Sequence, residues 1–171
     1  IVPTKAMQVF IRLHPDADEI AAVKISGNQV IIKTDRATIS SVLVEGRFPN
    51  YPDVIPKDAD KKIEVDTADF LNAVKRAALL TNEESKGIRM AVSSDGIVFS
   101  CRAPETGEAT VRLAVDYKQE PIEIGFNPSF LIDVLKVCGE RVTLELLSSS
   151  KPGVIKGGPD FKYVVMPVNL S

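Results

Sequence analysis

Two stretches of this sequence, "IEVDTADFLNAVKRA" at residues 63–77 and "IEIGFNPSFLIDVLKVC" at residues 122–138, follow the same plan. Each begins with an alternating segment typical of a strand. Each then has a turn with a capping residue, the pair Phe-Leu and an amphipathic run. One inserted residue, Phe126, separates the two patterns, and "IVPTKAMQVFIRL" at residues 1–13 follows the plan more loosely. The sequence therefore predicts an internal repeat.

Apolar spacing predicts a helix in each copy of the repeat. Asp66 or Thr67 can cap the second helix, and Asn127 can cap the third with Pro128 in its first turn. The apolar residues at one-face helical spacing are Met7, Phe10 and Ile11, then Phe70, Val74, Ala77 and Ala78, and then Phe130, Val134, Val137 and Cys138.

Each predicted helix is followed by three segments with strand character, and short turns rich in Gly, Asn, Asp and Ser join them. The expected strands are residues 22–25, 30–32 and 37–44, then 88–92, 97–101 and 110–115, and then 142–147, 154–155 and 163–168. The unit is thus β-α-β-β-β, at about residues 1–60, 61–120 and 121–171. We expect an α+β fold with antiparallel sheets and paired helices, because two units side by side can close a core that one cannot.

By this count, residues 61–171 form one complete domain and residues 1–60 form half of another. The segment "EGRFPNYPDVIPKDADKK" at 45–62 carries three prolines and is typical of a semi-rigid connector. The start at Ile1 suggests a processed or excised piece of a longer chain.

The amino-acid composition limits the classes of function that this chain can have. Hydrophobic content of 44% suits a globular protein with a core, and no apolar run approaches the roughly 18 residues of a membrane span. The net charge of −2 argues against a protein that coats nucleic acid with its whole surface, although one basic face stays possible. Cys101 and Cys138 are not spaced as a metal or redox pair, so free thiols in a reducing cytosol are expected.

The tail "YVVMPVNLS" at residues 163–171 is unusually apolar for the end of a chain. From the residues alone, it is either a core edge strand or part of a surface that a partner binds. The same choice exists for the basic residues of the helices, which form either a solvated face or a nucleic-acid contact.

Four stretches together resemble the bacterial DNA polymerase III beta subunit, or sliding clamp, family. They are "EGRFPNYPDVIPKD" at 45–58, "AVKRAALLTNEESKGIRMAVS" at 73–93, "IEIGFNPSFLIDVL" at 122–135 and "YVVMPVNL" at 163–170. The resemblance covers nearly the whole chain. It implies the DNA-clamp fold, with residues 1–60 as the second half of the middle domain and 61–171 as the C-terminal domain. Asp53, Phe130, Asn169 and Ser171 depart from the family pattern.

The resemblance further implies a cytoplasmic, non-enzymatic processivity factor without a cofactor. Two subunits would close a homodimeric ring around duplex DNA, without reading its sequence. Helices would line the hole. The residues that would face DNA are Lys5, Arg12, Lys75, Arg76 and Lys136, and Leu79 and Leu80 would meet the partner subunit.

In the family, the last residues form one wall of a pocket that takes short peptide motifs from the replicative polymerase, the clamp loader and repair polymerases. The matching positions in this chain are Pro49, Val54, Asn127, Phe130, Ser150, Pro152, Val164, Val165, Met166, Pro167, Val168 and Leu170. Two or three apolar anchors would give exchangeable binding.

Two other functions stay as alternatives. The first is an enzyme, although the sequence has no Gly-x-Ser-x-Gly elbow, no phosphate-binding loop and no metal-ligand spacing. The second is a peptide- or protein-binding module unrelated to replication.

Overall fold

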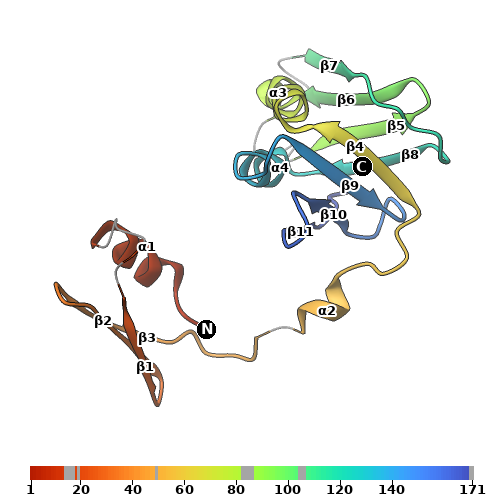
Figure 1. Ribbon diagram of the computed structural model, residues 1–171. Coiled ribbons are helices and arrows are strands. Elements are labelled where there is room, and N and C mark those ends of the chain that lie inside the picture. The colour runs from red at the N-terminus through yellow and green to blue at the C-terminus, as the bar shows by residue number, and fades with distance from the viewer. Residues whose placement is uncertain (14–17, 19, 49, 82–86, 104–106, 170–171) are drawn as a thin grey trace. The chain divides into compact units, whose positions relative to one another are not determined.

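The computed structural model describes residues 1–13, 18, 20–48, 50–81, 87–103 and 107–169 (Figure 1). Its internal contacts divide the chain into two units, Ile1–Asn50 and Tyr51–Ser171. The connector residues 51–60 therefore go with the second unit, whereas the repeat count placed them with the first.

The first unit contains one helix, α1 (Thr4–Leu13), and one antiparallel sheet in the order β1-β2-β3. Its strands are β1 (Ala22–Ser26), β2 (Gln29–Lys33) and β3 (Thr38–Val42), close to the ranges predicted. The described residues before α1 form no strand, although the Val44 N–H donates to the Ile1 carbonyl at 2.8 Å.

The core of this first unit is small. Ala6, Val30 and Ile32 are buried, but Met7 is 37% exposed and Ile11 is 64% exposed. The predicted apolar stripe of α1 is thus largely open to solvent, because one helix and three strands do not supply enough surface to cover it.

The second unit repeats the order strand, helix, three strands, as predicted. After a short helix α2 (Tyr51–Val54), the elements of the first copy are β4 (Lys61–Asp66), α3 (Thr67–Ala77), the 3-10 helix η1 (Ala78–Leu80), β5 (Ile88–Ser93), β6 (Gly96–Ala103) and β7 (Gly107–Leu113). Those of the second copy are β8 (Ile122–Phe126), α4 (Pro128–Leu135), β9 (Arg141–Leu146), β10 (Gly153–Lys156) and β11 (Lys162–Val165).

The two copies exchange their first strands. β4 pairs with β9 of the second copy, with Ile63 opposite Leu144, and β8 pairs with β5 of the first copy, with Ile124 opposite Met90. Both pairings are antiparallel, and the resulting sheets have the orders β11-β10-β9-β4 and β7-β6-β5-β8. Neither copy can complete its sheet without the other.

The helices α3 and α4 lie side by side and cover the two sheets from one side (Figure 1). Phe70 of α3 and Phe99 of β6 are fully buried, and their stacked ring centroids lie 5.8 Å apart. This core holds residues from every strand of both sheets, and it is continuous across the two copies. None of the described helices is long and apolar enough to cross a membrane.

Both predicted helix starts are confirmed. The Asp66 carboxylate accepts hydrogen bonds from the N–H groups of Ala68 and Asp69 at 2.9 and 3.0 Å. The Asn127 side chain accepts from the Ser129 N–H at 3.0 Å, with Pro128 in the first helical position. These caps satisfy N–H groups that a helix start leaves without an intrahelical partner.

The predicted apolar face of α4 is partly wrong. The helix ends at Leu135, so Val137 lies beyond it and is 70% exposed, and Phe130 is 50% exposed. The residues that face the core are Leu131, Val134 and Leu135, at i, i+3 and i+4. Both sets have helical spacing, and only the position of α3 and the sheets decides between them.

The difference in core size gives a prediction for hydrogen exchange. We expect the amides of β1 to β3 to exchange at least about tenfold faster than those of β5 and β9 in a monomer, equivalent to about 1.4 kcal/mol of local stability. The measurement is native-state exchange followed by mass spectrometry. Equal protection in both units would contradict the conclusion that the first unit lacks a sufficient core.

Candidate peptide pocket and basic helix face

A pocket of about 610 Å³ lies in the second unit, between the connector and the last strands. Its walls come from α2, from the connector that follows it, from the turn between β9 and β10, and from the residue after β11. The lining residues are Asp53, Val54, Ile55, Pro56, Lys57, Asp58, Leu147, Lys151, Pro152 and Met166.

Local hydrogen bonds shape two of these walls. The Ile55 N–H donates to the Tyr51 carbonyl at 3.3 Å and closes the single turn of α2, which lies in the segment predicted to be a semi-rigid connector. The Lys151 N–H donates to the Ser148 carbonyl at 3.3 Å in the turn between β9 and β10. Both walls are therefore turns, whose shape depends on few contacts.

The tail passes from one sheet to the other. β11 pairs with β10, but Pro167 then forms an isolated bridge with Phe126 of β8, and the Val168 N–H donates to the Gly125 carbonyl at 2.9 Å. Proline has no N–H to give to a ladder, which suits the place where the chain changes partner. Val165 is 2% exposed whereas Met166 is 58% exposed, so the tail is both a core edge and a surface.

The structure brings three of the predicted pocket residues, Val54, Pro152 and Met166, to this one cavity. Val54 is 45% exposed, so an apolar surface is available beside Met166. Around it lie Asp53, which the sequence analysis noted as a departure from the family pattern, and Lys57, Asp58 and Lys151, which it did not include. Such a site can hold one or two apolar side chains and bind their flanking backbone or charges.

The other predicted pocket residues lie near the tail or on α4 and are not in the lining of this cavity. Asn127 caps α4, Phe130 is half exposed on that helix, and the hydroxyl of Ser150 lies 3.4 Å from that of Ser148. Val164, Pro167 and Val168 are half-buried in the tail, and Val165 belongs to the core. Pro49 and Leu170 lie outside the described residues.

Several titratable groups of the second unit have shifted pKa values. A hydrogen bond from the Lys61 ammonium, 2.9 Å long, lowers the pKa of the exposed Asp60 carboxyl beside the connector. Burial raises the pKa of the Tyr163 phenol and of the Cys138 thiol. Burial thus disfavours the thiolate form of Cys138. No group of three or more His, Cys, Asp or Glu residues in the described part of the chain is placed to hold a metal ion.

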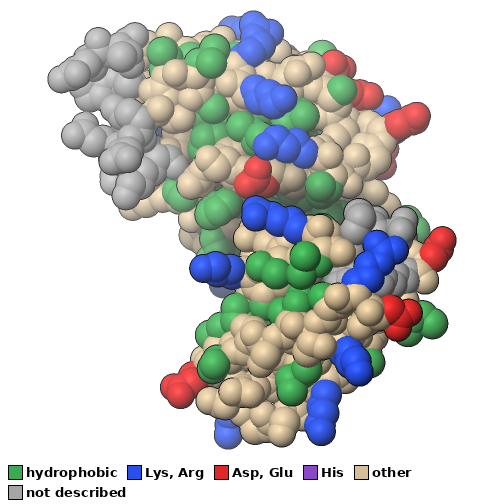
Figure 2. All heavy atoms as spheres, turned by 90° about the vertical axis from the view of Figure 1, so that its left-hand side faces the viewer, with side chains coloured by type: hydrophobic (Ala, Val, Ile, Leu, Met, Phe, Trp, Pro, Cys, Tyr) green, Lys and Arg blue, Asp and Glu red, His purple; other side chains and the backbone are tan. Residues whose placement is uncertain are grey.

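Basic side chains lie on the exposed face of the helices. Lys75 and Arg76 are exposed in the last turn of α3, and Lys136 is exposed after α4, 3.3 Å from the Asp133 carboxylate. In the upper part of Figure 2, which faces the side of α3 and α4, Lys and Arg side chains occupy the middle and most Asp and Glu side chains lie toward the edge. In the first unit, Lys5 and Arg12 are exposed on α1.

The two predicted interface leucines differ in exposure. Leu79 in η1 is 79% exposed, whereas Leu80 is half-buried and packs on the core. η1 contacts β7, whose outer edge pairs with no other strand among the described residues. An unpaired strand edge offers backbone N–H and C=O groups to another chain.

Residues 52–169 match the family model described as the DNA polymerase III beta subunit, C-terminal domain. The chain belongs to the DNA polymerase III beta subunit family. The family resemblance seen in the sequence is therefore confirmed.

Similar proteins support this membership along nearly the whole chain. The beta sliding clamp of Pseudomonas putida is 36% identical over 173 residues, which cover 99% of this chain and 47% of the relative. That of Escherichia coli K12 is 35% identical with the same coverage. This chain thus spans about half the length of the curated relatives it matches.

Solved sliding clamps share the fold. A Pseudomonas aeruginosa clamp crystallised with a ligand superposes with a TM-score of 0.91 at 34% identity, covering 99% of this chain and 47% of the clamp. A Bartonella birtlesii clamp bound to griselimycin gives 0.91 at 28% identity, covering 99% and 46%. The expected clamp fold is confirmed.

The contrast between Val165 and Met166 gives a stability prediction. Val165→Ala should lower the free energy of unfolding of the second unit by about 2 kcal/mol, because it removes buried methyl groups. Met166→Ala should change it by less than about 0.5 kcal/mol, because that side chain is mostly exposed. Urea unfolding of both variants measures the difference. A larger loss for Met166→Ala would place this side chain in the core.

Proposed function

We propose that this chain is part of a DNA polymerase processivity factor, a sliding clamp that encircles duplex DNA and tethers replication and repair proteins. Family membership over residues 52–169 is the observation that carries this proposal. The two-unit fold, the basic helices and the tail pocket are consistent with it. Ring closure would need the remaining length of the clamp and a second subunit.

The proposed DNA face is the exposed side of the helices, with Lys75, Arg76 and Lys136, together with Lys5 and Arg12 of α1. Such bases contact phosphates without reading sequence, and each contact releases counterions. The binding is therefore weak and sensitive to salt. Weak contact suits a clamp, because retention on DNA would come from closure of the ring while the duplex slides.

The proposed docking site for partner peptides is the tail pocket around Val54, Pro152 and Met166. Methionine adapts its shape to different apolar side chains, so one pocket can serve several proteins. The clamp of Bartonella birtlesii bound to griselimycin supports a ligand site in this family. Replicative polymerase, clamp loader and repair polymerases would take turns at it.

We propose that Leu79, the half-buried Leu80 and the free edge of β7 form the contact with the partner subunit. The exposed leucine would be buried, and the strand edge would gain hydrogen bonds from a strand of the other subunit. A homodimeric ring would follow in the full-length protein.

The peptide pocket can be tested with Met166→Ala. The dissociation constant of a peptide that carries the clamp-binding motif of a replicative polymerase should rise about tenfold, because one apolar anchor is lost. Isothermal titration calorimetry measures it. Met7→Ala, a methionine in the first unit, is the matched control and should bind as the unchanged chain does. Equal affinity of the Met166 and Met7 variants would exclude the tail pocket.

The DNA face can be tested with the double variant Lys75→Gln and Arg76→Gln. The slope of log binding constant against log salt for a short duplex should decrease by about 2, one for each lost phosphate contact. Fluorescence anisotropy at low salt gives these slopes. The control is the double variant Lys118→Gln and Lys162→Gln, which removes the same net charge from a loop and from β11. It should change the salt slope only slightly. If the Lys118/Lys162 variant lowered the slope more than the Lys75/Arg76 variant, α3 would not belong to the DNA face.

A further inference from the structure

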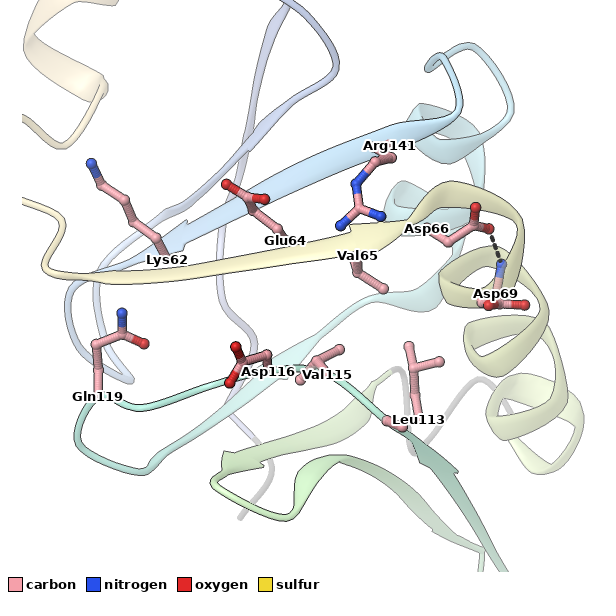
Figure 3. A pocket seen from close by; sticks show the side chains of 11 residues that line it. Lys62, Glu64, Val65, Asp66, Asp69, Leu113, Val115, Asp116, Gln119 and Arg141 are labelled. Carbon is pink, nitrogen blue, oxygen red and sulfur yellow. Dashed lines mark hydrogen bonds between the residues drawn. The ribbon is translucent and has the colours of Figure 1, made fainter.

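A second pocket, of about 630 Å³, lies in the second unit between β4 and the segment that follows β7 (Figure 3). Its lining contains none of the residues assigned to peptide, DNA or subunit contacts. The lining residues are Lys62, Glu64, Val65, Asp66, Asp69, Leu113, Ala114, Val115, Asp116, Gln119 and Arg141.

The internal repeat explains why this pocket is open. In the second copy, the residues after the last strand return to the first strand of the same copy, where Pro167 bridges Phe126. The corresponding residues of the first copy, 114–116 after β7, face β4 but form no bridge with it. One junction between the sheets is therefore closed by the chain itself, and its counterpart is left open.

The open junction exposes an edge strand. β4 pairs with β9 on one side only, and no described strand lies on its other side. An unpaired edge offers backbone N–H and C=O groups to an added strand. The opposite wall is the extended segment 113–116, so an extended chain entering the pocket would lie along β4.

The side chains in the pocket divide into an apolar floor and charged walls. Figure 3 shows Val65 pointing into the opening from β4, with Leu113 and Val115 opposite. Val65 is 4% exposed, and the other two are half-buried against the core. This floor can take the alternate apolar side chains of an extended peptide.

The walls carry more acids than bases. The lining contains four acidic residues, Glu64, Asp66, Asp69 and Asp116, and two basic residues, Lys62 and Arg141. Within the described chain, Glu64 and Asp69 have no ion-pair partner, and Asp116 pairs only with Lys118, 3.2 Å away and 81% exposed. The excess negative charge disfavours a polyanion such as DNA and favours a basic segment.

We propose that this pocket binds an extended peptide in which apolar residues alternate with Lys or Arg, added as a strand to the free edge of β4. The apolar side chains would rest on the floor, and the basic ones would reach Glu64, Asp69 and Asp116. This is a second peptide site, separate from the tail pocket and of opposite preference to the DNA face.

The test uses the full chain and a six-residue peptide, the length of β4, with alternating Val and Lys, acetylated and amidated at its ends. Amide shifts in NMR titrations should concentrate in residues 61–66 and 113–116 and leave those around Met166 unchanged. The matching Val/Glu peptide should bind at least about tenfold more weakly, and raising the salt should weaken the Val/Lys peptide.

Charge-reversal variants test whether the acidic residues of this pocket bind the peptide. Glu64→Lys with Asp116→Lys should weaken the Val/Lys peptide about tenfold. Asp95→Lys with Asp160→Lys adds the same charge in turns outside the pocket and should weaken it much less. Equal weakening in both double variants, shifts that map elsewhere, or equal binding of the Val/Glu peptide would overturn the proposal. The thermal midpoint of each variant is measured first, and Glu64→Gln with Asp116→Asn replaces the reversal if that variant fails to fold.

Discussion

Each copy of the repeat in residues 51–169 gives its first strand to the sheet of the other copy, and this exchange constrains the rest of the unit. With β4 on β9 and β8 on β5, the two copies cannot separate without breaking both ladders. α3 and α4 are then held next to each other, because each follows directly on an exchanged strand. The side of the helices that faces away from the sheets becomes one surface with basic residues.

The same exchange decides where binding can occur. The two sheets have four edge strands in total, and these edges differ in whether another part of the chain covers them. The tail covers the β8 edge through Pro167, and this places Met166 beside the connector. Among the described residues, the edges of β4 and β7 pair with no further strand; β4 lines a charged pocket, and β7 contacts the 3-10 helix that carries Leu79. All the proposed partner sites except the DNA face therefore lie at strand edges or junctions, where the core leaves backbone groups unpaired.

The sequence predicted the strands, the helix caps and the repeat because these depend on local chemistry. Asp66 and Asn127 cap the helices that their positions indicate, and the turns lie where Gly and Asn occur. It failed for the face of α4, where Phe130 is as apolar as Leu131 and only tertiary packing chooses between them. The sequence also could not tell which of Val165 and Met166 is buried. Alternation places their side chains on opposite faces of the strand, but it does not say which face packs against the core. The strand exchange itself has no local signal, because β4 and β8 look alike.

Reciprocal exchange has a consequence for continuity of the chain. The segment between β7 and β8 is the only covalent link between the copies, yet the two copies are also held by two ladders and a shared interior. If the chain were cut in that segment, the two ladders and the shared core would still connect the two pieces. The association of the two copies thus rests on their exchanged strands and common core as well as on the peptide link between them.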